Sequence, residues 1–380
     1  MKRWHGTLII FAVMVVALAF NTTLARWLPY IENVILILHI AGFFIVLITI
    51  TVMAPVKSSA HDVFAQFTNG GGFESTRLSL FVGLLGAVFM FLGADGAVHM
   101  AEEMKGVTTA LPLALVSSIV INGTLGFAML IAVLFCIGDL DVALESPTGY
   151  PFIAIFTSAT QSVAGGTGLT AIVLTFSFCA TIAVLTAASR QLWAFSRDNG
   201  LPFSKFASYV DPKLRLPIPA IGITVTVTCL LSLINIGSAT AFNAMISLVV
   251  AGYLASYILP LTLMIWRRLT DPTLELGPWN MGKTGNWVNM FAVVWAIIAF
   301  FFSFWPPLMN PDLATMKYVL FSVIYSAMSW CALSLLTPVY SWSILLYGFT
   351  VIFSIVFYIF YGRKTYKGLV IETSGSEIIA

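Results

Sequence analysis

Long apolar stretches repeat along the chain and are separated by short polar connections. A helix needs roughly 20 apolar residues to cross a bilayer, and most of the stretches reach that length. The pattern therefore predicts an all-α fold, a polytopic membrane helix bundle. The stretches are 7–25, 34–54, 79–100, 111–137, 169–195, 218–236, 242–266, 287–308, 318–336 and 341–361.

A shorter apolar segment lies between residues 150 and 160, flanked by Pro151 and by two glycines at 165 and 166. It is too short to span a bilayer, so we predict a short helix in an outer loop. Residues 1–361 are expected to form a single transmembrane bundle, with about nine spans and one extra apolar segment near 318–336. Residues 362–380 are expected to form a cytosolic tail.

The composition agrees with a membrane protein. Hydrophobic residues make up 59% of the chain and charged residues 9%, and the mean hydropathy is +0.97. Soluble domains carry about 25% charged residues. The net charge of +2 predicts no nucleic-acid partner. The four cysteines fall in apolar runs, and no metal-ligand spacing, phosphate loop or catalytic triad is visible. We therefore expect neither an enzyme nor a protein with a metal or cofactor.

Basic residues gather in every second connection. Thirteen of the eighteen Lys and Arg residues lie there, whereas the stretch 138–168 contains acids and no base. The positive-inside rule assigns the basic connections to the cytosol. These connections are 26–30, 101–110, 190–217, 267–286 and 362–380.

The apolar stretch 318–336 breaks this alternation. No charged connection separates it from the next stretch, so a full crossing would place the basic tail outside. We expect this segment to lie at the membrane interface, to fold back, or to be an artefact of the gene model such as a translated intron.

The sequence Gly93-Ala94-Asp95-Gly96 interrupts the apolar stretch 79–100. Glycines free the backbone from the helical pattern, and a charge at this depth is costly. Broken membrane helices are tolerated where the freed groups are buried in protein or line a cavity, and secondary transporters build substrate sites from them. The interruption therefore predicts half of a solute site.

The ends of two half-helices provide free N–H groups on one side and free carbonyls on the other. Such ends can hold the carboxylate and the amine of an amino acid. Phe89 and Phe91 are candidate walls of the pocket, since an aromatic face can bind a quaternary amine; the alternative is ordinary core or lipid-facing Phe. For Asp95, the alternative to a role in the site or its gate is a structural hydrogen bond to a neighbouring helix end. For Gly93 and Gly96, the alternative to a role in the site is close helix packing.

Three segments carry a resemblance to a known family. They are residues 3–8 (RWHGTL), 91–103 (FLGADGAVHMAEE) and 189–202 (SRQLWAFSRDNGLP). The chain resembles a fungal member of the amino acid–polyamine–organocation permeases, near the choline and GABA permeases. The resemblance covers most of residues 3–316 and 341–372.

This family has twelve spans, with two inverted five-helix repeats followed by two helices. Aligned on the motifs, the chain resembles a partial 5+5 inverted-repeat fold that lacks the first three helices, which we interpret as N-terminal truncation. In relatives the substrate lies between the unwound first and sixth helices. Half of that site would then be absent. The resemblance also implies an integral plasma-membrane or vacuolar-membrane location, with a small amine or amino acid, protons and the lipid bilayer as partners.

A lone His39 stands in the apolar stretch 34–54. It falls where relatives among the amino-acid exchangers carry a lysine that replaces a sodium ion. Because a histidine gains and loses a proton near neutral pH, the resemblance implies a proton-coupling role. Ser177 and Thr181 share one helical face and resemble hydroxyls that hold sodium in relatives. The alternatives are a neutral histidine bonded to a carbonyl and hydroxyls that serve helix packing.

Charged residues follow the interruption and recur after the stretch 169–195. We interpret Glu102 and Glu103 as candidate partners of Arg190 and Arg197 in an inner gate; the alternative is a solvated face. The sequence predicts a secondary carrier for an amino acid, choline, GABA or a related amine, with symport of protons. The alternative is a truncated membrane protein that does not transport, or that regulates a complete carrier. The sequence does not indicate an oligomeric state.

Overall fold

The computed structural model describes residues 3–146, 148–237, 239–271, 273–274, 276–305, 342–366 and 368. All regular structure in these ranges is helical. Seven of the described helices are long and apolar enough to cross a membrane, which confirms an all-α, multi-pass bundle. They are Arg3–Thr22, Ala25–Met53, Val107–Cys136, Val163–Arg197, Ile218–Gly237, Leu248–Thr270 and Thr284–Ser303. The apolar segment 318–336 and most of the tail lie outside the described residues.

The helices follow the predicted apolar stretches, but their ends differ from the predicted bounds. Helix α9 begins six residues before its stretch because Ser162 caps it, its Oγ accepting a hydrogen bond from the Gly165 N–H at 3.3 Å. The short helix predicted at 150–160 is α8, and its location in an outer loop stays a prediction. The long elements are α1 (Arg3–Thr22), α2 (Leu28–Met53), α4 (Thr76–Phe89), α6 (Val107–Cys136), α8 (Pro151–Thr160), α9 (Val163–Arg197), α11 (Ile218–Ser232), α13 (Ala239–Thr270), α14 (Thr284–Ser303) and α16 (Trp342–Phe357).

Short helical elements connect the long ones. One of them, α12, continues α11 after an interruption at Leu233, so the predicted stretch 218–236 is two helices. The short elements are η1 (Ala25–Trp27), α3 (Ala60–Phe64), α5 (Gly96–His99), η2 (Ala101–Glu103), α7 (Leu140–Leu144), α10 (Ser204–Ala207), α12 (Ile234–Gly237), η3 (Tyr358–Gly362) and α17 (Arg363–Thr365).

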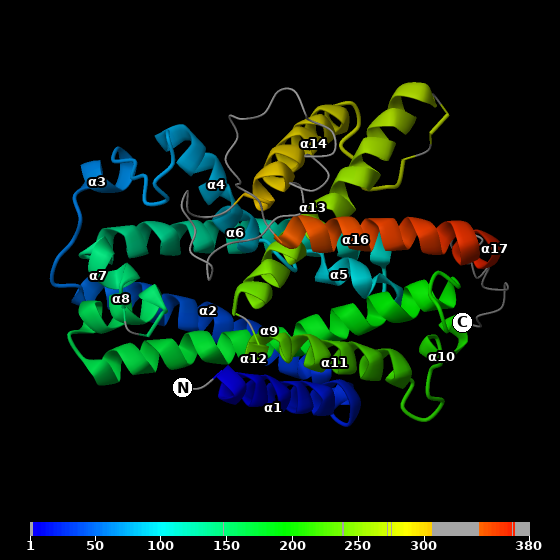
Figure 1. The fold of residues 1–380 in the computed structure, drawn as a ribbon, viewed down its shortest axis with the longest axis horizontal. Coiled ribbons are helices and arrows are strands. Elements are labelled where there is room, and N and C mark those ends of the chain that lie inside the picture. The colour runs from blue at the N-terminus through cyan, green and yellow to red at the C-terminus, as the bar shows by residue number, and fades with distance from the viewer. Residues whose placement is uncertain are drawn as a thin grey trace.

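Helix α9 runs through the middle of the bundle and packs against α1, α2, α5, α8 and α11 (Figure 1). Its approach to α2 is close because Gly42 has no side chain: a Cβ there would lie 2.3 Å from the ring of Phe176. Buried side chains on both sides of α9 form two apolar clusters, one around Ile50 and Leu169 and the other around Met14 and Leu185. Helix α9 therefore connects the two clusters.

A second group of helices consists of α4, α13 and α14. In Figure 1, α13 and α14 lie beside each other and are inclined to the long helices α6 and α9. A third apolar cluster joins Val88 of α4 to Val250 of α13 and Ala299 of α14. This packing places α13 next to the end of α4, where the chain leaves the helix.

Candidate functional site

Helix α4 ends at Phe89, and the chain turns through residues 90–95 before α5 begins at Gly96. Gly93 adopts a φ of +87°, which an L side chain rarely adopts. The turn is held by bonds between residues three apart, from the Ala94 N–H to the Phe91 carbonyl at 3.2 Å and from the Gly96 N–H to the Gly93 carbonyl at 3.0 Å. The helix is thus interrupted where the sequence predicts an interruption.

Helix α13 holds the interrupted segment. The Tyr253 hydroxyl donates a hydrogen bond to the Phe91 carbonyl at 3.2 Å. Tyr257, one helical turn further along α13, lies near the Asp95 side chain, and the two tyrosine rings lie 5.1 Å apart. One phenol of α13 therefore satisfies a carbonyl of the break, and a second lies beside its acid.

Asp95 has a second partner one helical turn later. Its Oδ2 lies 3.6 Å from His99 Nε2. Both side chains are shielded, with exposed fractions of 18% for Asp95 and 27% for His99. An acid at membrane depth needs a partner or water, and the sequence places a histidine four residues away, on the same helical face.

A cavity of ≈1260 Å³ opens at the break. Its walls come from the end of α1, the start of α2, the break with α5, the second half of α9, and α11. Most of the lining is apolar, and the ionisable residues carry both signs of charge. These residues are Arg26, Glu32, Asp95, His99, Glu103 and Arg190. Such a lining matches a small ligand with an apolar body and charged ends.

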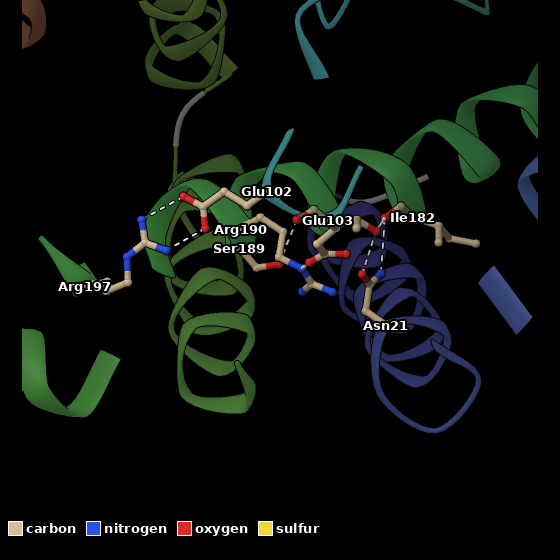
Figure 2. Close-up of polar contacts among 8 residues, drawn as sticks. Asn21, Glu102, Glu103, Ile182, Ser189, Arg190 and Arg197 are labelled. Carbon is tan, nitrogen blue, oxygen red and sulfur yellow. Dashed lines mark hydrogen bonds and ion pairs between the residues drawn. The ribbon is translucent and has the colours of Figure 1, made fainter. Parts of the chain in front are cut away.

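Two ion pairs connect the segment after the break to α9 (Figure 2). Arg190 donates through its Nε to Glu103 Oε1. Arg197 donates through both terminal nitrogens to the two oxygens of Glu102, at 2.6 and 2.8 Å. The four residues interpreted from the sequence as a gate are therefore paired, Glu103 with Arg190 and Glu102 with Arg197.

The two pairs differ in burial. Arg190 is only 6% exposed, and its Nη1 has no hydrogen-bond partner in the part of the chain that the structure describes. Arg197 is more exposed, and its guanidinium lies over the Trp193 ring at 5.2 Å. A buried guanidinium depends on its carboxylate partner much more than an exposed one.

A buried polar contact beside the cavity was not predicted from the sequence. Asn21 of α1 accepts a hydrogen bond from the Thr186 hydroxyl at 2.7 Å and donates to the Ile182 carbonyl at 3.2 Å (Figure 2). Both polar residues are buried and line the cavity. A single Asn and a single Thr separated by 165 residues form no pattern in a sequence, so periodicity could not reveal this contact.

The predicted substrate residues are divided between the cavity and its surroundings. Gly93, Asp95 and Gly96 line the cavity, whereas Ala94 belongs to the turn without lining it. Phe91 lies against α6, its ring 3.4 Å from the position that a Cβ of Gly123 would take. Phe89 is exposed on α4. The aromatic walls expected from these two residues stay a prediction.

His39, Ser177 and Thr181 lie away from the cavity. His39 is exposed on α2 and contacts the Phe176 ring of α9, with centroids 5.0 Å apart. The Ser177 hydroxyl donates to the Val173 carbonyl, and the Thr181 hydroxyl donates to the Ser177 carbonyl, both within α9. The structure thus places His39 beside the helix that carries the two hydroxyls. The coupling role assigned to the three residues stays a prediction.

A family model described as amino acid permease matches residues 1–325. A candidate amino acid/polyamine transporter of Macrophomina phaseolina is 35% identical over 83% of this chain and 70% of its own length. The choline transporter of Saccharomyces cerevisiae is 32% identical over 87% of this chain and 59% of its own. Amino-acid permease 2 of Neurospora crassa is 25% identical over 92% of this chain and 59% of its own. The chain therefore spans about three fifths of two of these relatives.

Proposed function

The chain belongs to the amino acid permease family, and from this premise we propose that it is a secondary transporter for amino acids or related amines such as choline or GABA. The break at Gly93 and Asp95, which opens into a cavity lined by charges of both signs, carries this proposal. An interrupted helix exposes backbone dipoles to a solute without exposing them to lipid.

The substrate class follows from the lining and from the names of the relatives. The carboxylates of Asp95 and Glu32 suit an ammonium group, whereas Arg190 suits a carboxylate. The relatives are named for amino acids, polyamines and choline, all of which carry a cationic nitrogen. The residues that line the cavity and the names of the relatives therefore both indicate a solute that carries an amine.

Coupling to protons is the second part of the proposal. Asp95 and His99 lie 3.6 Å apart within the cavity wall, where a substrate amine competes with a proton for the carboxylate. A histidine changes its charge between about pH 5 and 8. His39, the residue singled out from the sequence, remains the alternative coupling residue, with Ser177 and Thr181 on the adjacent helix.

An inner gate is the third part. Loop charges assign the ends of α1 and α9 to the cytosol, so the cavity faces the cytosolic half of the bundle. The pairs of Glu103 with Arg190 and of Glu102 with Arg197 connect the helix after the break to α9 at that end. We assign residues 1–361 to one bundle and residues 362–380 to a cytosolic tail, in the plasma membrane or the vacuolar membrane.

Uptake of labelled solutes tests the proposal. The chain is expressed in yeast cells that lack their own choline and amino-acid uptake, and choline, GABA and lysine are supplied separately. We expect saturable uptake of at least one solute, reduced about 10- to 100-fold in Asp95→Asn, since a hydrogen bond to a charged group contributes about 1.5–3 kcal/mol.

Asp141→Asn is the matched control, because Asp141 is exposed at the start of α7, outside the cavity. It makes the same chemical change and should leave uptake intact. Both variants are compared at equal membrane abundance. If no solute enters cells that contain the protein in their membrane, or if both variants behave alike, the carrier assignment is wrong.

A further inference from the structure

A second cavity lies where α13 passes into α14, far along the chain from the break. Its volume is ≈460 Å³, and its polar lining comes from Arg268 at the end of α13, Lys283 and Asn286 at the start of α14, and Asp271 between the helices. Leu274 and Leu276 complete an apolar side. This site shares no residue with the cavity at the break.

Two buried polar atoms of this cavity have no partner among the described residues. They are Arg268 Nε, a donor, and Asn286 Oδ1, an acceptor. Buried polar groups are normally hydrogen-bonded, and each unpaired group costs about 1–3 kcal/mol. A ligand that both accepts and donates hydrogen bonds would satisfy the two atoms together.

The guanidinium of Arg268 is held in place by the backbone. Its Nη1 donates to the Gly282 carbonyl at 3.4 Å, and it lies over Gly285, where a Cβ would be 2.6 Å from that nitrogen. Gly285 thus leaves the space that the guanidinium occupies. The position of Arg268 therefore depends on a glycine at the first turn of α14.

Among the described residues, Asp271 is the acid that lines this cavity, and it is already engaged. The Asp271 Oδ1 accepts hydrogen bonds from the Thr273 hydroxyl at 2.6 Å and amide at 3.0 Å, and Oδ2 lies 3.6 Å from Arg267. These contacts hold the pKa of the Asp271 carboxyl below its usual value, with the Thr273 hydrogen bonds as the main cause. Arg268 and Lys283 are left to attract an anion.

Exposed tryptophans lie on the end of α13, on the start of α14 and in the connection between these two helices, the same part of the chain that lines this cavity. Trp266 is 60% exposed in the last turn of α13, Trp279 is 53% exposed in the connection, and Trp287 is 74% exposed in the first turn of α14. Tryptophan is enriched where membrane helices meet the headgroup region. The connection is also one of the basic ones that the loop charges assign to the cytosolic side. The cavity thus lies at the depth of the inner-leaflet headgroups.

We propose that this cavity binds the headgroup of an anionic phospholipid of the inner leaflet. Its phosphate accepts from Arg268 and Lys283, and an amine or hydroxyl of the headgroup donates to Asn286. Basic pockets on the cytosolic side of membrane helices are suited to such headgroups, and the leucines provide an apolar side for the lipid beneath them. A lipid bound at this site holds the connection between α13 and α14 at negatively charged lipids of the inner leaflet.

Native mass spectrometry of the whole chain in mild detergent tests the site, with phosphatidylserine and phosphatidylcholine as probes. We expect phosphatidylserine to bind more tightly and Arg268→Gln to weaken it about fivefold or more, because a basic residue near an anionic surface contributes about 1 kcal/mol. Arg267→Gln, the same change at the neighbouring residue outside the cavity, should weaken binding less than about twofold.

Gly285→Ala is a second variant that keeps every charge and displaces the Arg268 guanidinium. It should weaken phosphatidylserine binding as Arg268→Gln does, and it decides the outcome if Arg268→Gln fails to fold. Equal binding of the two lipids, equal losses in Arg267→Gln and Arg268→Gln, or full binding by Gly285→Ala would overturn the site. Displacement of bound phosphatidylserine by inorganic phosphate would also overturn it, because the ligand would then be a soluble anion.

Discussion

Glu103 and Arg190 are 87 residues apart in the chain, and the buried Nε of Arg190 donates to the Glu103 carboxylate. Glu103 ends the short helical segment that follows the break, whereas Arg190 belongs to the helix at the centre of the bundle. The contact therefore fixes the far end of the break against α9, which packs against α1, α2, α5, α8 and α11. A movement of the break must either carry α9 with it or separate this pair.

Removing the carboxylate charge should destabilise the protein. In Glu103→Gln the guanidinium of Arg190 stays buried without a counter-charge, and we expect a loss of about 1–3 kcal/mol, less than for a fully buried pair because Glu103 is 53% exposed. Glu102→Gln is the matched control at the more exposed pair and should cost less than about 1 kcal/mol. Thermal unfolding in detergent measures both, and equal losses would contradict the assigned difference in burial.

The two glycines of the break should respond differently to alanine. Gly93 has a φ of +87°, so Gly93→Ala should cost about 1–2 kcal/mol although no atom lies within 4 Å of the new Cβ. Gly96 is equally open and starts α5 with an ordinary φ, so Gly96→Ala should be neutral or stabilising by up to about 1 kcal/mol. Unfolding temperatures of the two variants give the comparison. A larger loss in Gly96→Ala would mean that Gly93 does not need its positive φ.

Local patterns predicted much of the fold and part of the site. Long apolar runs identify most spans, and glycines beside Asp95 identify the break, because both signals lie within one segment of chain. Opposite charges on two segments that the positive-inside rule predicts to lie on the same side indicate the pairs of Glu102 and Glu103 with Arg190 and Arg197. The start of α9 was missed because its first turns contain Gly165 and Gly166, which lower the apolar count without preventing a capped helix.

Contacts between distant segments could not be predicted in this way. The ring of Phe91 lies close to Gly123 of α6, and in a chain with 30 phenylalanines no pattern distinguishes a pocket wall from a packing residue. Likewise, Asn21 finds Thr186 only because α1 and α9 pack together. Tertiary packing decides which of many similar side chains meet.

The contact of Asn21 with Thr186 should be worth a measurable coupling energy. Asn21→Ala removes an acceptor and a donor from a buried site and should cost about 1–3 kcal/mol. Thr186→Val keeps the shape, and the double variant should lose less than the sum of the single variants by about 1 kcal/mol. Thr228→Val is the matched control, since its hydroxyl donates within its own helix to the Thr224 carbonyl. Strict additivity of Asn21→Ala and Thr186→Val would show that the contact contributes nothing.

The pH dependence of uptake should distinguish the two candidate histidines. His99 lies 3.6 Å from Asp95 in the cavity wall, which Glu103 and Arg190 also line, and Tyr257 lies near Asp95. His39 is exposed on α2 and contacts Phe176. A proton that couples to the solute has to compete at the solute's own site, so His99→Gln should flatten the pH dependence of uptake. His39→Gln should keep that dependence.

Exchange of labelled for unlabelled solute at constant pH provides the control for this comparison. Exchange needs no net proton movement, so a variant that loses only the coupling keeps exchange and loses accumulation driven by a pH gradient. We expect this behaviour from His99→Gln. If His39→Gln shows it instead while His99→Gln behaves as the unmodified chain, the proton passes along α2 and α9, and Ser177 and Thr181 become the next residues to change.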